Sequence, residues 1–162
     1  SSNGPILTTE DKQLFQDGVS AIDDQAYPEA KVIFEALIKR HSSLAGAHVN
    51  LGLIAEAEQE LEFALEHYEK ALAINPLNTQ ALIQQASVKQ AKGEFKLAEE
   101  YLQRALSSKP KHPVVNYNLG VLYELYLQDY RKAIEHYEAY VEIAKDEDTK
   151  TVKRWIKMLE RK

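Results

Sequence analysis

The sequence predicts an all-α fold of four stacked helical hairpins followed by a C-terminal capping helix, because two sets of small residues recur along the chain. One set keeps a spacing of 34 residues and comprises Gly18, Gly52, Ala86 and Gly120. The other starts with the same spacing and gains one inserted residue before its last member; it comprises Ala30, Ala64, Ala98 and Ala133. A large residue follows each of these alanines four positions later, at Phe34, Tyr68, Leu102 and Tyr137. Small residues let neighbouring helices approach closely, and the large ones fill the space between them.

The composition excludes several functional classes. The chain has 162 residues, 44% of them apolar, and a formal net charge of -5, which is typical of one well-folded domain. The acidic balance argues against a nucleic-acid partner, which requires clustered Lys and Arg. Cysteine is absent, so disulfides and cysteine metal sites are excluded. No apolar run approaches the roughly 18 residues of a membrane span, and we expect no direct membrane insertion.

The repeats predict the order of the elements. Residues 1–8 are expected to be a flexible leader or an artificial chain end, and residues 9–147 are expected to hold four repeats, at 11–44, 45–78, 79–112 and 113–147. Short polar residues and a proline favour helix starts at Thr8 or Thr9, Ser42 or Ser43, Asn78, and His112-Pro113. The turn expected at residues 58–60 has no helix breaker, and propensity alone favours a continuous helix there. The repeat register nevertheless predicts a break.

Residues 148–162 are predicted to form the capping helix. Val152, Trp155, Ile156 and Leu159 have the relative positions 0, 3, 4 and 7, which puts them on one helix face. We expect this face to cover the last hairpin, because a stack of repeats must close its open end. A basic amphipathic helix could instead lie on a membrane or bind a partner.

At these positions the chain resembles the tetratricopeptide repeat family. The family pattern of Leu-Gly, Ala, an aromatic residue, Ala and Pro is matched by Leu51-Gly52, Ala64, Tyr68, Ala71 and Pro76. The resemblance covers about residues 11–147 and implies a right-handed α-solenoid of about four such hairpins. The closing Pro is replaced by Ser42 in the first repeat and Lys145 in the last, and terminal repeats of such arrays are often atypical.

The segment Glu-His-Tyr-Glu occurs twice, at residues 66–69 and 135–138. A zinc site on a helix would need a second His three or four residues from the first, and neither copy has one. The sequence also lacks a Gly-rich phosphate loop and a Gly-x-Ser-x-Gly motif. We therefore interpret the segment as one part of a second helix that occurs in two repeats. We predict no catalytic residue, no metal and no cofactor.

The resemblance implies that the first helices of successive repeats line a concave groove. By register, the residues expected to contact a partner are Phe15, Val19, Val49, Asn50, Leu53, Ile83, Gln84, Tyr117, Asn118 and Val121. The twelfth places of the repeats are expected to face the groove as well; they hold Ile22, Glu56, Gln90 and Glu124. The amides could bond the backbone of an extended peptide or a helix. The apolar side chains could contact this ligand or pack between neighbouring first helices.

We predict a non-enzymatic scaffold that binds a peptide or helix of a partner protein in this groove, within a bacterial envelope assembly. The alternative is a structural solenoid that self-associates into a homo-oligomer without a peptide ligand. Six of the nine tyrosines lie in the fourth repeat, where they form either a contact surface or a core. The small polar residues at the start resemble those that follow the lipid-bearing Cys of bacterial lipoproteins. This resemblance favours a periplasmic or membrane-tethered protein, and the protein is otherwise expected in the cytoplasm.

Overall fold

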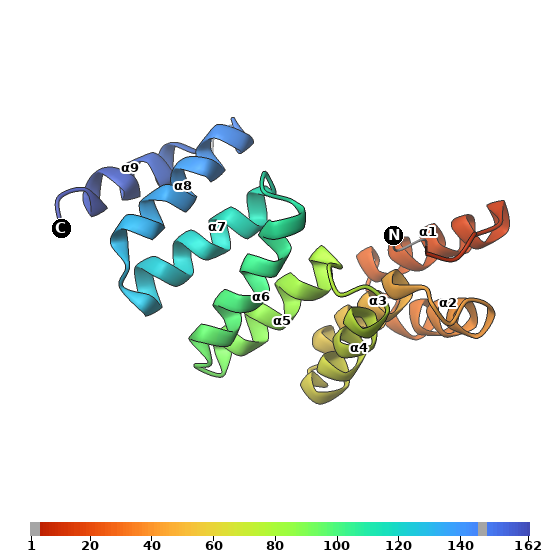
Figure 1. Ribbon diagram of the computed structural model, residues 1–162. Coiled ribbons are helices and arrows are strands. Elements are labelled where there is room, and N and C mark those ends of the chain that lie inside the picture. Colours follow the sequence, from red (N-terminus) through yellow and green to blue (C-terminus); the bar gives the residue numbers. More distant parts are fainter. Residues whose placement is uncertain (1–3, 146–148) are drawn as a thin grey trace. The chain divides into compact units, whose positions relative to one another are not determined.

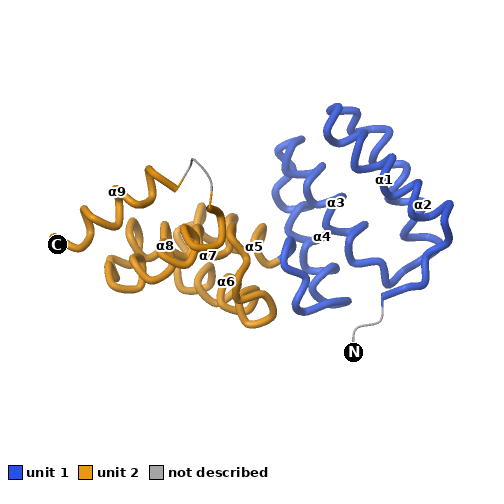
Figure 2. Tube along the Cα trace, turned by 90° about the horizontal axis from the view of Figure 1, so that it is seen from above, with its two compact units in different colours: residues 1–81 blue, residues 82–162 orange. Residues whose placement is uncertain are grey.

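The structure is a computed structural model that describes residues 4–145 and 149–162. Its described residues form nine α-helices and one π-helical segment and no strand, so the predicted all-α fold is confirmed (Figure 1). The elements are α1 (Thr9–Asp23), α2 (Tyr27–Arg40), α3 (Ala45–Ala57), α4 (Leu61–Ile74), α5 (Thr79–Ala91), α6 (Phe95–Ser108), α7 (Pro113–Leu122), η1 (Tyr123–Leu127), α8 (Tyr130–Ala144) and α9 (Thr149–Leu159). The chain divides into two compact units, residues 1–81 and 82–162, which are described separately (Figure 2).

Each of three hairpins closes on a glycine of its first helix and an aromatic ring of its second helix. A Cβ atom on Gly52 would overlap with the ring of Tyr68, and a Cβ atom on Gly120 would overlap with the ring of Tyr137. In the first hairpin, a Cβ atom on Gly18 would lie 2.7 Å from Cζ of Phe34. The three rings are almost completely buried. Gly18, Gly52 and Gly120 are therefore places where the two helices of a hairpin touch.

The turn inside each hairpin places one residue in the left-handed region of backbone conformation. These residues are Gln25, Gln59, Gly93 and Gln128, with φ between 54° and 78°. They keep the repeat spacing of 34, except that the inserted residue adds one position before Gln128. The next residue donates its N–H to a carbonyl of the preceding helix, as Glu60 does to Ala55 at 2.8 Å, and this bond ends the helix. The break predicted at residues 58–60 is confirmed. The turn forms although only one of the four residues is a glycine.

The inserted residue of the fourth hairpin is accommodated in a π-helix. Segment η1 covers Tyr123–Leu127, directly after α7. The N–H of Asp129 therefore bonds the carbonyl of Tyr123, six residues back, instead of five as in the other turns. The left-handed residue Gln128 then leads into α8.

The observed helix starts agree with most of the predicted ones. The hydroxyl of Thr8 caps α1, the Asn78 Oδ1 atom accepts from the Ala81 N–H at 3.0 Å, and the His112 ring accepts from the Val115 N–H at 3.3 Å. The start predicted at Ser42 or Ser43 is wrong. Helix α3 begins after Leu44, which provides no side-chain cap.

Helix α9 packs against α8 at the end of the second unit (Figure 1). Its buried residues include Val152, Ile156 and Leu159, and Trp155 is half-buried beside them. The expected capping helix is therefore present, with the predicted face turned inward.

Gly52→Leu is expected to lower the free energy of unfolding by about 1–3 kcal/mol, because the added side chain cannot fit against the buried Tyr68 ring. Urea denaturation of the variant and the unmodified protein measures the difference. Ala57→Leu, at an exposed position of the same helix, is the control and should change stability little. Equal stability of the Gly52 variant would mean that this contact does not determine the packing.

Gln59→Gly is expected to raise the free energy of unfolding by about 0.5–1 kcal/mol. The left-handed conformation costs a non-glycine residue about 1–2 kcal/mol, and glycine removes this cost. The gain exceeds the free energy lost because glycine gives the unfolded chain more conformational freedom. The matched control is Gln16→Gly, at an exposed position inside α1, which should be destabilising by about 1 kcal/mol. Chemical denaturation measures the free energy of unfolding of each variant. A Gln59 variant that is less stable than the unmodified protein would contradict this explanation of the turn.

Candidate functional site

The tyrosines of the two Glu-His-Tyr-Glu segments lie inside their hairpins. The hydroxyl of Tyr68 donates to Oε2 of Glu56 at 2.5 Å, and the hydroxyl of Tyr137 donates to Oε2 of Glu124 at 2.6 Å. Burial, helped by these carboxylates, raises the pKa of both tyrosines above the ordinary value, so both remain neutral donors. Glu56 and Glu124, which were expected to face a ligand, are thus engaged within the protein.

The histidines of the two segments also bond within their hairpins. The Nδ1 atom of His67 lies 3.4 Å from Nδ1 of His48, and Nδ1 of His136 lies 3.1 Å from Oδ1 of Asn116. Burial lowers the pKa of His48, His67 and His136, so the neutral rings are favoured. No three His, Asp or Glu side chains in the described ranges lie together as metal ligands. These contacts support the interpretation of the segment as a structural part of the hairpin.

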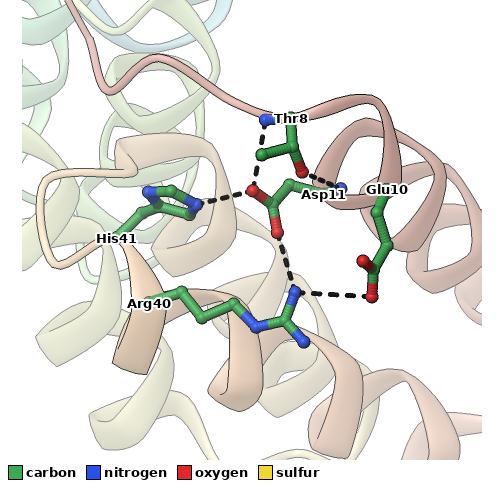
Figure 3. Close-up of polar contacts among 5 residues, drawn as sticks. All are labelled: Thr8, Glu10, Asp11, Arg40 and His41. Atoms are coloured by element: carbon green, nitrogen blue, oxygen red, sulfur yellow. Dashed lines mark hydrogen bonds and ion pairs between the residues drawn. The ribbon is translucent and has the colours of Figure 1, made fainter.

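A cluster of charged residues joins the start of α1 to the end of α2 (Figure 3). The buried carboxylate of Asp11 accepts from Arg40 at 2.9 Å and from the backbone N–H of Thr8 at 3.2 Å, and it lies 2.8 Å from Nε2 of His41. The hydrogen bond to His41, followed by those to Arg40 and Thr8, holds the pKa of Asp11 far below its ordinary value. Because these bonds use both carboxylate oxygens, the cluster is a structural junction and not a site for a ligand.

In the first unit, the predicted groove residues of α1 are partly covered by neighbouring helices. Phe15 and Val19 pack against the buried cluster that contains Phe34. The ring of Phe15 lies edge-on to that of Phe34, with 5.4 Å between centroids. These side chains are half-buried, and most of their contact is with the protein itself.

The predicted residues of α3 differ in how accessible they are. Val49 is only 4% exposed and belongs to the core cluster of the second hairpin, and Leu53 packs against the same cluster. Asn50 is half-buried and its Nδ2 atom donates to the carbonyl of Gly46 at 2.8 Å. Its Oδ1 atom is left as the group that a ligand could use.

In the second unit, three predicted residues lie together. Ile83 is only 8% exposed and Gln84 is half-buried. Tyr117, Asn118 and Val121 of α7 line a cavity of about 210 Å³. The remaining lining comes from α5 and α6, and it consists of Ala86, Ser87, Gln90 and Leu102.

This cavity lies at the hairpin that departs from the glycine–aromatic pattern. Ala86 and Leu102 occupy the positions that hold Gly52 and Tyr68 in the second hairpin. Leucine is shorter than tyrosine and has no hydroxyl, so it does not reach the twelfth place of the repeat. That place holds Gln90, which lines the cavity. The substitution of Leu for an aromatic residue is the sequence signal that indicates this cavity.

A second cavity of the same unit was not expected from the sequence. It has a volume of about 420 Å³ and is lined by Val114, Tyr117, Tyr140, Thr151, Val152 and Trp155, from α7, α8 and α9. The Tyr117 ring lies 5.3 Å from that of Tyr140 and 6.3 Å from that of Trp155. The six tyrosines of the fourth repeat indicated an aromatic surface in this region. The position of Trp155 beside them could not be predicted, because it depends on how α9 packs.

Asp11→Asn is expected to lower the melting temperature at pH 7, because the bonds of a carboxylate to Arg40 and His41 are lost. An Asp whose pKa is depressed on folding contributes stability above its ordinary pKa of about 4, and the contribution is lost as the pH falls below that value. The difference between variant and unmodified protein should therefore shrink between pH 5 and pH 2 in thermal denaturation. Asp24→Asn, at an exposed position, is the control; a difference that does not change with pH would exclude the ionised carboxylate as the cause.

Two curated proteins are similar to part of the chain. The general transcriptional corepressor trfA of Dictyostelium discoideum is 38% identical over 90 residues, which are 56% of this chain and 6% of that protein. The general transcriptional corepressor ssn6 of Schizosaccharomyces pombe is 33% identical over 96 residues, 54% of this chain and 8% of that protein. The chain thus spans less than a tenth of the length of these relatives. No helix in the described part of the chain has the length and apolarity needed to cross a membrane.

Solved structures share the fold at low sequence identity. PilF of Pseudomonas aeruginosa has a TM-score of 0.81 at 23% identity, over 93% of this chain and 69% of that one. A tetratricopeptide repeat protein of Parabacteroides merdae has a TM-score of 0.73 at 22% identity, over 94% of this chain and 61% of that one. MamA of Desulfovibrio magneticus has a TM-score of 0.67 at 18% identity, over 96% and 98% of the two chains.

Family models for the tetratricopeptide repeat match residues 45–78 and residues 83–148. These ranges contain most of the paired helices of the second, third and fourth hairpins, with the Gly52–Tyr68 and Gly120–Tyr137 contacts. The chain therefore belongs to the tetratricopeptide repeat family, and its repeats support a role as a scaffold for protein–protein interaction.

Proposed function

We propose that the protein binds an extended segment of a partner protein in the cavity formed by α5, α6 and α7. The observation that carries this proposal is the combination of polar and apolar groups in one concave surface. Ser87, Gln90 and Asn118 supply hydrogen-bonding groups, and Tyr117 and Val121 supply apolar contact. Such a combination is typical of sites that bind a peptide through its backbone and one or two side chains.

The free state of the Asn118 amide supports this role. Asn118 is half-buried, and within the described residues no hydrogen bond engages its side chain, in contrast to Asn50. A half-buried amide can bond both the N–H and the C=O of an extended backbone. The volume of about 210 Å³ fits a short stretch of chain better than a separate small molecule, since sites for the latter usually have about 300–1,000 Å³.

Two expectations from the sequence stay predictions. One is a role in a bacterial envelope assembly, because the similarity to bacterial structures is below 25% identity and shows the fold alone. The other is the alternative of a homo-oligomer without a peptide ligand. Light scattering at low protein concentration tests that alternative directly.

Asn118→Ala is expected to weaken binding by about 1–3 kcal/mol, because a ligand polar group loses its partner in a desolvated contact. Ligands would be selected from a random peptide library against the unmodified protein, and their affinities for the variants measured by fluorescence anisotropy. Thermal stability should hardly change. Glu100→Ala, at an exposed position of α6, is the control and should leave affinity unchanged.

A second variant closes the cavity without removing a polar group. Ala86→Gly combined with Leu102→Tyr rebuilds the pair that Gly52 and Tyr68 form in the second hairpin. The ring is expected to fill the cavity, so the fold should persist while peptide binding is lost. Selected peptides that bind both variants as tightly as the unmodified protein would exclude this cavity as the binding site.

A further inference from the structure

The charge of the chain is distributed unevenly, and one helix carries an excess of basic residues. Residues 1–81 hold thirteen Asp and Glu against five Lys and Arg, whereas residues 82–162 hold twelve against fifteen. Four of the basic residues line a shallow surface cavity of about 380 Å³ on α9: Lys150, Lys153, Arg154 and Lys157. Although the net charge is -5, these four side chains form a local basic surface, the α9 basic face.

The α9 basic face adjoins the aromatic cavity of about 420 Å³ that Tyr117, Tyr140 and Trp155 line. Arg154 connects them, because its Nη2 atom donates to Oγ1 of Thr151 at 3.2 Å, and Thr151 lines the aromatic cavity. On a helix, residues 151 and 154 are three positions apart and therefore neighbours on the surface. A ligand could fill the cavity and reach the basic side chains at once.

We propose that this composite surface binds an acidic segment of a partner protein that carries a bulky apolar residue. The apolar side chain enters the aromatic cavity, whose volume suffices for one large side chain. A carboxylate next to it pairs with Arg154, and carboxylates further along the segment pair with Lys150, Lys153 and Lys157. The site goes beyond the proposed groove, because it depends on α8 and α9, which do not line the cavity of α5 to α7.

The chemistry of the surface selects this ligand. Aromatic rings can also bind cations, but four neighbouring cationic side chains repel a positively charged ligand. An anionic membrane is disfavoured because Val152, Ile156 and Leu159, the apolar side chains that such a helix would insert, are buried within the unit.

The small extent of the α9 basic face favours a short ligand over an extended polyanion. Charges on a protein surface are screened over about 8 Å at physiological ionic strength. A short acidic segment therefore interacts mainly with the α9 basic face. A nucleic-acid duplex or a bilayer presents negative charge over a much larger area than these four basic side chains can neutralise.

Trp155 allows a direct test, because it is the only tryptophan in the chain and lines the cavity. The probe is the synthetic peptide Glu-Asp-Phe-Glu-Asp with blocked ends, titrated while Trp155 emission is recorded. We expect a saturable change in emission. The affinity should fall about tenfold or more when NaCl is raised from about 0.05 M to about 0.5 M, and a peptide with Ala in place of Phe should bind at least about tenfold more weakly.

Charge reversal on α9 provides the matched variants. Lys153→Glu with Lys157→Glu, both at exposed positions, should weaken the peptide by about tenfold or more. Lys12→Glu with Lys39→Glu changes the net charge equally at exposed positions of the first unit and should leave the affinity unchanged. Circular dichroism checks that both variants are folded.

Three results would overturn the proposal: no change in Trp155 emission with the peptide, equal affinity in both charge-reversed variants, or binding of phosphatidylglycerol vesicles without any binding of the peptide. This test is independent of the peptide binding proposed for the cavity of α5 to α7. Asn118→Ala is expected to leave the affinity for this acidic peptide unchanged while it weakens the peptides selected for the groove, so either proposal can fail alone.

Discussion

The absence of a side chain at Gly52 permits the contact on which the second hairpin depends, because the buried ring of Tyr68 occupies the space where a Cβ atom would lie. The hydroxyl of that ring then bonds Glu56, so one close approach fixes both the packing and a polar contact across the hairpin. The same arrangement recurs with Gly120 and Tyr137. Where the pair becomes Ala86 and Leu102, both residues line the cavity of α5 to α7.

The hairpins could be predicted from sequence because their closest contacts require specific residue types at a fixed spacing. Local propensity was a weaker guide: residues 58–60 contain no helix breaker, yet Gln59 adopts a left-handed conformation and the helix ends. The packing of α3 against α4 offsets the small conformational cost of the left-handed Gln59, because tertiary contacts override local propensity. The inserted residue of the fourth hairpin was visible in the sequence, but the spacing alone could not show that a π-helix at Tyr123–Leu127 accommodates it.

The candidate site was harder to predict, since register tells which side of a helix a residue occupies and not how closely a neighbour covers it. Val49 and Ile83 are on predicted groove positions and are nevertheless buried. The Asn50 amide bonds its own helix, and Glu56 bonds a tyrosine. Only a structure shows these internal partners. Asn118 is the predicted amide that lines the cavity of α5 to α7, whereas Asn50 bonds its own helix.

Tyr117 lines both the cavity of α5 to α7 and the aromatic cavity beside α9. Its ring is held on one side by Tyr140 and Trp155, which belong to helices that follow it in the chain. The capping helix thus does more than cover the apolar end of the last hairpin, because it contacts Tyr117, a residue of the proposed binding cavity. The end of a repeat array needs a different sequence from its middle. The first helix of the last repeat has no following repeat that could position its side chains. Here α9 supplies that neighbour, and the basic residues on its outer face give this end of the second unit a charge that the chain as a whole does not have.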